Sequence, residues 1–139
     1  MRIHRLIPLL FVLGACDSDP LGVGDVSVEV ELLGSPTQAR SLRYQVQNHG
    51  SRSVYVAACD NQVVGIVQRE EGPVWVDLNS AMCLGTVSSA PIELEPGETT
   101  IGNTAVTGSG QFRVGVLLRS GPNDQEGDEI ALSDRVTVP

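Results

Sequence analysis

The feature that most constrains the fold of this chain is a strict alternation of apolar and polar residues. In the segment 26–32, valine or leucine occupies every even position, and serine or glutamate occupies every odd position. A period of two is typical of a β-strand with one buried face and one face in water. Similar alternation recurs at 42–47 and at 112–118. The pattern therefore predicts half-buried strands.

Turn residues divide the rest of the chain into short segments of the same kind. We expect strands at 26–32, 42–47, 52–58, 62–68, 73–78, 92–94, 99–106, 111–119, 130–132 and 135–138, with a bulge as one way to join the last two. No segment after residue 24 combines a helical period with capping residues. Short strands separated by turns predict an all-β fold, an immunoglobulin-like β-sandwich of about 7–9 strands. A small β-barrel or jelly roll is the alternative.

Residues 1–15 have the composition of a secretory signal peptide. Arg2 and Arg5 precede the apolar run 6–13, and two small residues follow it. This order of charged, apolar and small residues is typical of a signal that is removed on export. The apolar run is too short to cross a bilayer as a helix, which needs about 20 residues. We therefore expect the mature chain to have no transmembrane segment.

The sequence Leu13-Gly14-Ala15-Cys16 resembles the lipobox of bacterial lipoproteins. The resemblance implies cleavage before Cys16 and acylation of that cysteine, whereas an ordinary signal with a chance cysteine is the alternative. Two or more acyl chains anchor a protein stably to a membrane. Residues 16–24 would then be the lipidated cysteine and a tether, and 25–139 the domain. Asp17 resembles the inner-membrane retention signal of enteric bacteria, but the choice between inner and outer membrane stays open, as does exposure to the periplasm or the exterior.

With Cys16 assigned to the lipid, Cys59 and Cys83 remain as an even pair. Disulfides persist in the oxidising compartments that exported proteins reach. We therefore expect a Cys59–Cys83 disulfide, which would stabilise the domain by roughly 3–4 kcal/mol in the chain-entropy model. Zinc is the alternative, but there is no C-x-x-C spacing, and His49 is the single histidine outside the signal. We predict no metal and no cofactor.

Charge and missing motifs narrow the classes of function. The net charge is −8 and all nine basic residues are arginine, which argues against a nucleic-acid partner. Without residues 1–15 the net charge becomes −10, so attraction of a polybasic segment to anionic lipid is excluded. There is no G-x-S-x-G motif, and we expect His49 to be an exposed turn residue that stands apart from any serine–carboxylate pair. These features predict that the protein is not an enzyme.

Oxygen-bearing side chains gather in the segment 121–129. Asp124, Glu126 and Asp128 form a weak calcium candidate, because calcium takes six to eight oxygen ligands. Their spacing does not match an EF-hand loop, and a polar hairpin tip is the alternative interpretation.

The single tryptophan, Trp75, lies on the opposite face of its predicted strand from Val74 and Val76. We expect it in the core, with an exposed recognition anchor as the alternative.

Three turn motifs after residue 47 are similar to those of small bacterial immunoglobulin-like domains, including the domains grouped with the BsuPI-type intracellular proteinase inhibitor. The motifs are Asn-His-Gly at 48–50, Pro-Gly at 96–97 and Gly-Gln-Phe at 110–112, and the resemblance spans residues 26–138. It implies a sandwich fold but identifies no inhibitory loop. Cys59, Trp75 and Cys83 lie too close in sequence for the antibody pattern, so we expect their disulfide to clip neighbouring strands or a loop.

Together these patterns predict a membrane-anchored cell-envelope lipoprotein with a non-enzymatic binding or assembly role. The expected partners are the membrane, through the lipid anchor, and an envelope protein that meets a sheet edge or loop, for example by strand addition. A proteinase-inhibitor-like domain is the alternative, on fold analogy alone. An envelope enzyme is a third hypothesis, which a cluster of serine, His49 and an acid would favour.

Overall fold

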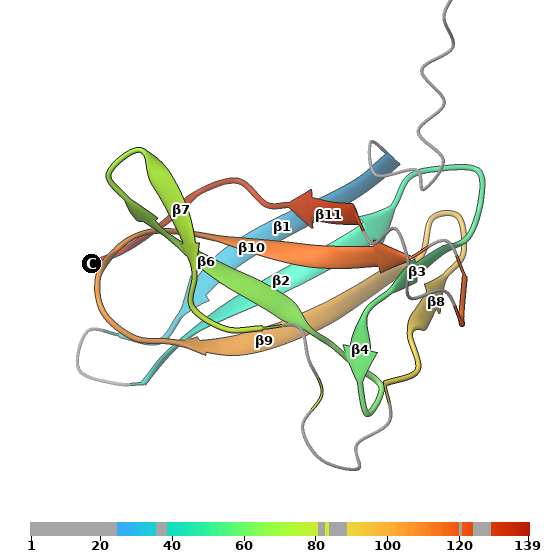
Figure 1. Ribbon diagram of the computed structural model, residues 1–139, viewed down its shortest axis with the longest axis horizontal. Helices are drawn as coiled ribbons and strands as arrows, with labels where there is room; N and C mark the ends of the chain where they lie inside the picture. Colours follow the sequence, from blue (N-terminus) through green and yellow to red (C-terminus); the bar gives the residue numbers. More distant parts are fainter. Residues whose placement is uncertain (1–24, 36–38, 81–82, 84–88, 120, 124–128) are drawn as a thin grey trace, which may run out of the picture.

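The computed structural model describes residues 25–35, 39–80, 83, 89–119, 121–123 and 129–139. The predicted signal peptide, Cys16 with its tether, and the calcium candidates at 124–128 lie outside the described residues. Every regular element of the described part is a β-strand, which confirms the predicted all-β class (Figure 1).

Three long antiparallel strands form the smaller of two facing sheets. These are β1 (Val26–Leu33), β2 (Arg40–Asn48) and β9 (Thr99–Val106), in the order β1-β2-β9. Leu42, Tyr44 and Val46 of β2 are fully buried, whereas the residues between them are at least partly exposed. The alternation in the sequence therefore places one face of this sheet in the core and the other in water.

The larger sheet is built around β10 (Gly110–Arg119). Its strand order is β7 (Val74–Asp77), β6 (Gly65–Glu71), β10, β3 (Val54–Val56), β8 (Ile92–Leu94), and β11 (Glu129–Leu132) and β12 (Val136–Val138) also pair with β10. Along β10, β6 pairs with residues 112–116 and β3 with 118–119, while β12 and β11 pair with 110–112 and 115–118. All strand pairs are antiparallel, and β10 is the centre of the sheet.

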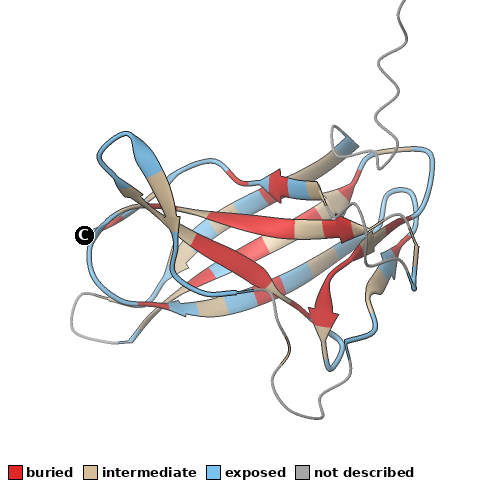
Figure 2. Cartoon of the chain, viewed as in Figure 1, coloured by how far each residue is buried: buried red, intermediate tan, exposed pale blue. Residues whose placement is uncertain are grey.

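The core lies between the two sheets, and buried residues from both form one cluster (Figure 2). The large sheet contributes Phe112, Val114, Val116 and Leu118, which alternate along β10 and are fully buried. Tyr44 enters from the small sheet and donates a hydrogen bond from its hydroxyl to the Val63 carbonyl at 2.8 Å. Packing of two sheets over one apolar core confirms the predicted sandwich.

A short hairpin divides the chain where the sequence predicted the strands 52–58 and 62–68. It consists of β4 (Ala58–Cys59) and β5 (Gln62–Val63), joined by Asp60 and Asn61. Both turn residues have positive φ, 50° and 64°, as a two-residue type I′ turn requires. The described residues form twelve strands, more than the predicted 7–9, and this extra hairpin accounts for part of the difference.

A bulge separates β11 from β12, as the sequence suggested. Leu132 lies opposite Gly115 and Val136 opposite Phe112, so the segment 133–135 faces a segment of β10 that is one residue shorter. The Ser133 N–H donates to the Val114 carbonyl, and the Ser133 hydroxyl accepts from the Val114 N–H, both at 2.9 Å. The extra residue changes which positions face the core. The odd-numbered Ala131 is buried in β11, whereas the even-numbered Val138 is buried in β12.

The turn motifs at 48–50 and 95–98 meet at one end of the sandwich. The Asn48 N–H donates to the Glu98 carbonyl at 3.0 Å, and the Gly97 N–H donates to the Asn48 carbonyl at 2.8 Å. β1 begins at this same end, because Val26 lies opposite Asn48. The described chain ends at the other end of the sandwich (Figure 1).

Candidate functional site

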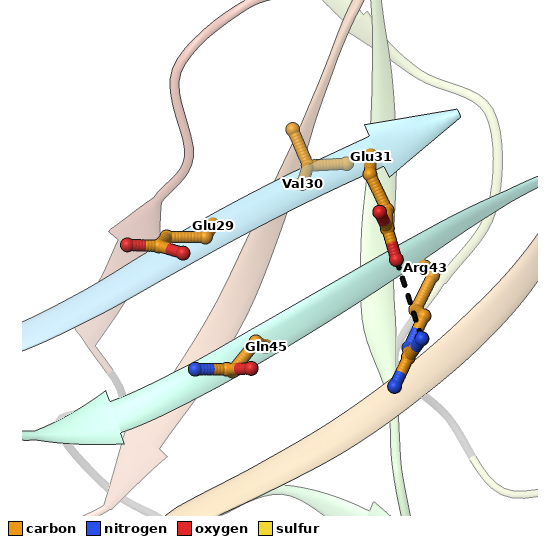
Figure 3. A pocket seen from close by; sticks show the side chains of 5 residues that line it. All are labelled: Glu29, Val30, Glu31, Arg43 and Gln45. Carbon is orange, nitrogen blue, oxygen red and sulfur yellow. Dashed lines mark hydrogen bonds and ion pairs between the residues drawn. The ribbon is translucent and has the colours of Figure 1, made fainter. Parts of the chain in front are cut away.

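The outer face of the β1–β2 pair carries a shallow depression of about 230 Å³ (Figure 3). Its lining residues are Glu29, Val30, Glu31, Arg43 and Gln45. The strand register sets Glu29 opposite Gln45 and Glu31 opposite Arg43. Alternation along β1 therefore brings two carboxylates to one side of an edge strand.

The charges of this depression are partly balanced. Arg43 Nη1 lies 3.4 Å from Glu31 Oε1, and both side chains are about half exposed. An ion pair in water contributes roughly 0–1 kcal/mol, so it orients the side chains more than it stabilises the fold. Glu29 faces the neutral Gln45, which leaves the depression with a net negative charge. Its chemistry suits a cation or a basic side chain.

Ser27 and His49 lie on the same outer face, at the end where β1 begins. Ser27 Oγ is 2.8 Å from Nε2 of the His49 ring. The backbone N–H of His49 donates a hydrogen bond to the backbone carbonyl of Asp25 at 2.7 Å. His49 is exposed, as expected of a turn residue, and it contacts a serine that the sequence did not single out. The pairing of β1 with β2 brings the two residues together. Ser27 lies opposite Gln47, and His49, two residues further along the chain, points to the same outer face.

A serine and a histidine in contact can act as a nucleophile and its base, provided that other groups assist. A hydrolytic triad also needs an acid that orients the histidine and donors that stabilise an oxyanion. Among the described residues, no hydrogen bond joins the His49 ring to a carboxylate, and His49 itself is exposed. The geometry thus supplies two of the parts that a serine hydrolase needs.

The disulfide joins Cys59 to Cys83, which confirms the predicted pair. Their Cα atoms are 5.5 Å apart, and the bond ties the β4–β5 hairpin to the segment that follows β7. Neither cysteine belongs to the two facing sheets, so the bond clips a hairpin to a loop, as the spacing predicted.

Trp75 lies on the outer face of the large sheet and is half buried, so the expected core position is wrong. The Arg113 guanidinium lies 4.2 Å from the centroid of its ring, and that of Arg135 lies 5.5 Å away. Gln68 Oε1 accepts a hydrogen bond from Arg113 Nε at 2.6 Å, and Glu70 pairs with Arg135 at 3.3 Å. Cation–π contacts with two arginines from distant parts of the chain account for its position.

Sequence reasoning missed Ser27, Glu29, Glu31 and Arg43 as members of a site. The alternation of β1 placed the first three on the wet face, but their neighbours depend on the pairing with β2. Within the described ranges, no group of three or more histidine, cysteine or acidic side chains is arranged to hold a metal ion. No described segment forms a helix with the length and apolar character of a membrane span.

Comparison of the chain with protein-family models and with curated proteins finds no match. The resemblance to lipoproteins and to bacterial immunoglobulin-like domains therefore stays a prediction from the motifs.

Proposed function

We propose that this chain is a lipid-anchored protein of the bacterial cell envelope that binds a partner without catalysing a reaction. The observation that carries the proposal is the Cys59–Cys83 disulfide. It uses two of the three cysteines of the chain, so Cys16 in the lipobox-like sequence has no cysteine of the same chain left to pair with. A structural disulfide also fits an oxidising compartment outside the cytoplasm.

The fold supports a tethered arrangement of the domain. Residues 17–24 form a short link between Cys16 and Asp25, and when fully extended they reach at most about 27 Å. β1 therefore begins near the anchor, together with His49 and the Pro96-Gly97 turn. The outer faces of both sheets run away from that end, and they present the surfaces on which a partner can bind.

Metabolic labelling with an alkyne analogue of palmitate tests the anchor in a bacterial host. The wild-type chain should take up the label and sediment with membranes, and Cys16→Ser should lose both properties. Asp17→Ser is the matched control, because it changes the neighbouring residue and keeps the thiol. Label on the Cys16→Ser chain, or none on the wild type, contradicts the proposal.

The Ser27–His49 contact favours a second candidate, a serine hydrolase of the envelope. A fluorophosphonate probe forms a covalent bond with an activated serine and separates the two candidates. The binding role predicts no labelling of the purified chain. Labelling that Ser27→Ala removes and Ser51→Ala keeps would establish the hydrolase instead. The inhibitor alternative predicts inhibition of at least one protease in a broad panel.

A further inference from the structure

β1 forms a border of the small sheet, since β2 is the one strand that pairs with it among the described residues. The backbone N–H of His49 donates to the Asp25 carbonyl, and these two residues continue the register that sets Val26 opposite Asn48. Bonded and non-bonded pairs alternate along an antiparallel ladder. The Asn48 N–H accordingly points to the other side, where it donates to Glu98. The odd-numbered residues of β1 therefore bond to β2, whereas the even-numbered residues point their N–H and C=O groups toward the free edge.

The second half of this edge is open. Val28 is nearly covered, at 6% exposure, whereas Val30 and Leu32 are partly exposed and Val30 lines the depression beside β1. Within the part of the chain that the structure describes, no hydrogen bond reaches the N–H or C=O of Val30 or Leu32 on this side. A row of backbone groups without partners is a template on which another strand can pair.

The two sides of the open edge differ in chemistry. On the outer side, Glu29 and Glu31 are exposed and give the depression its net negative charge. On the inner side, Val30 and Leu32 pack against the core, and so does Val136 of the neighbouring strand β12. All three of these aliphatic side chains are only partly buried. A strand placed here meets carboxylates with one face and aliphatic groups with the other.

We propose that an extended segment of another protein adds to β1 as an antiparallel strand, with arginine or lysine at alternate positions and aliphatic residues between them. The aliphatic residues lie opposite Val30 and Leu32, in pairs that exchange backbone hydrogen bonds. The basic residues lie opposite Glu29 and Glu31, in non-bonded pairs whose side chains come closer together. The inference rests on the proposed binding role and gives the partner of that role its chemistry.

A second copy of the chain does not supply such a segment. No two of its nine basic residues lie two positions apart in the sequence. Pairing of two β1 strands would set the glutamates of one copy against those of the other, and like charges directly opposite each other are destabilising. Glu29 and Glu31 therefore disfavour a second copy and favour a basic strand from another protein.

A synthetic peptide in which valine and arginine alternate serves as the probe, and amide hydrogen exchange of the purified full chain is followed by NMR. The N–H groups of Val30 and Leu32 should exchange fast in the free chain and slowly when the peptide is bound. Those of Glu29 and Glu31 bond to β2 and should be slow in both states. Unchanged exchange at Val30 and Leu32 in the presence of the peptide overturns the proposal.

Methylation of peptide nitrogens tests the backbone pairing without altering the protein. In the proposed register the valine N–H groups of the peptide donate to β1, and the arginine N–H groups point away from it. A probe methylated at its valine nitrogens should therefore lose binding, and a probe methylated at its arginine nitrogens should keep it. Binding that survives methylation of the valine nitrogens overturns the proposal.

The charge pairing is tested with two variants of equal net charge. Glu29→Gln should weaken binding of the probe about threefold, the size expected from one cross-strand ion pair. Glu95→Gln removes the same charge from an exposed residue outside β1 and should bind as the wild type does. An equal loss in both variants assigns binding to the net charge of the chain and overturns the proposal, as does no loss in Glu29→Gln.

Palmitate labelling of the same chain separates this inference from the proposed anchor. If the chain takes up the label but the probe does not bind, the strand addition is wrong and the anchor stands. If the probe binds with the expected dependence on methylation and on Glu29 but the chain takes up no label, the anchor is wrong and the strand addition stands.

Discussion

The side-chain amide of Asn48 donates a hydrogen bond to the Leu94 carbonyl at 3.0 Å, so a fully buried polar group connects β2 to the end of β8. The same amide nitrogen donates to the Arg52 carbonyl at 2.8 Å, and its oxygen accepts from the Gly50 N–H at 2.9 Å. Every polar atom of this side chain is therefore paired. One side chain therefore holds the turn that contains Gly50 and Arg52 and the end of β8 together at this end of the sandwich.

Replacement of Asn48 by alanine should destabilise the domain by about 3 kcal/mol, because each buried group left without a partner costs about 1–3 kcal/mol. Chemical denaturation of the purified chain measures the loss. Asn103→Ala is the matched control, since Asn103 is exposed, and it should change the free energy of unfolding by less than about 0.5 kcal/mol. Equal losses from the two variants would show that the Asn48 contacts contribute nothing.

Tyr44 should make the stability depend on pH in the alkaline range. Burial raises the pKa of its hydroxyl above the ordinary value of 10.0, and a backbone hydrogen bond from Gly65 lowers it in part. Because the folded pKa is the higher one, stability is constant below pH 10 and falls as the pH rises toward the folded pKa. The chain has no lysine, so few other groups titrate there.

Denaturation curves measured between about pH 8 and pH 11, on either side of the ordinary tyrosine pKa of about 10, test how the free energy of unfolding depends on pH. Tyr44→Phe should lower stability at neutral pH by about 1 kcal/mol, through loss of the bond to Val63, and should flatten the alkaline decline. If stability still declines in the same way in Tyr44→Phe, groups other than Tyr44 cause the alkaline decline.

Gly102 is required by the ring that packs on it. A Cβ at this position would lie 2.3 Å from Tyr44 Cζ and 2.4 Å from its hydroxyl oxygen. Gly102→Ala should therefore cost about 1–3 kcal/mol through displacement of the ring. Gly121→Ala is the control, because a Cβ there meets no atom within 4 Å. Thermal melting compares the two, and a stable Gly102→Ala chain would mean that Tyr44 moves freely.

Reduction of the Cys59–Cys83 disulfide should destabilise the domain by roughly 3 kcal/mol, the amount expected for a loop of this length. The sheets should persist, since neither cysteine belongs to them. Circular dichroism with and without a reducing agent measures both effects. Loss of the β signal at room temperature would show that the clip is essential for folding.

Strands with clear alternation and one turn at each end could be predicted from the sequence. The segments 92–94 and 99–106 match β8 and β9 at both ends. The β4–β5 hairpin was missed because strands of two residues show no period. Asp60 and Asn61 could have marked the turn, since short polar side chains tolerate positive φ.

The site depended on contacts between residues that lie far apart in sequence. Trp75 was expected in the core because its neighbours are valines, but its environment is set by Arg113 and Arg135. The bond between Ser27 and His49 required the register of β1 against β2. The alternation predicts on which face of a sheet a residue lies, whereas its contacts depend on which strands pair and in which register.

The central place of β10 also has a consequence for how the chain acquires its structure. β3 ends 54 residues and β6 ends 39 residues before β10 begins, and both need β10 as a neighbour. The β1–β2 hairpin can form early, but the large sheet must wait until the chain has been made as far as Arg119. Because contacts between distant segments form slowly, we expect the large sheet to form well after the β1–β2 hairpin, which suits the export before folding that the proposed function requires.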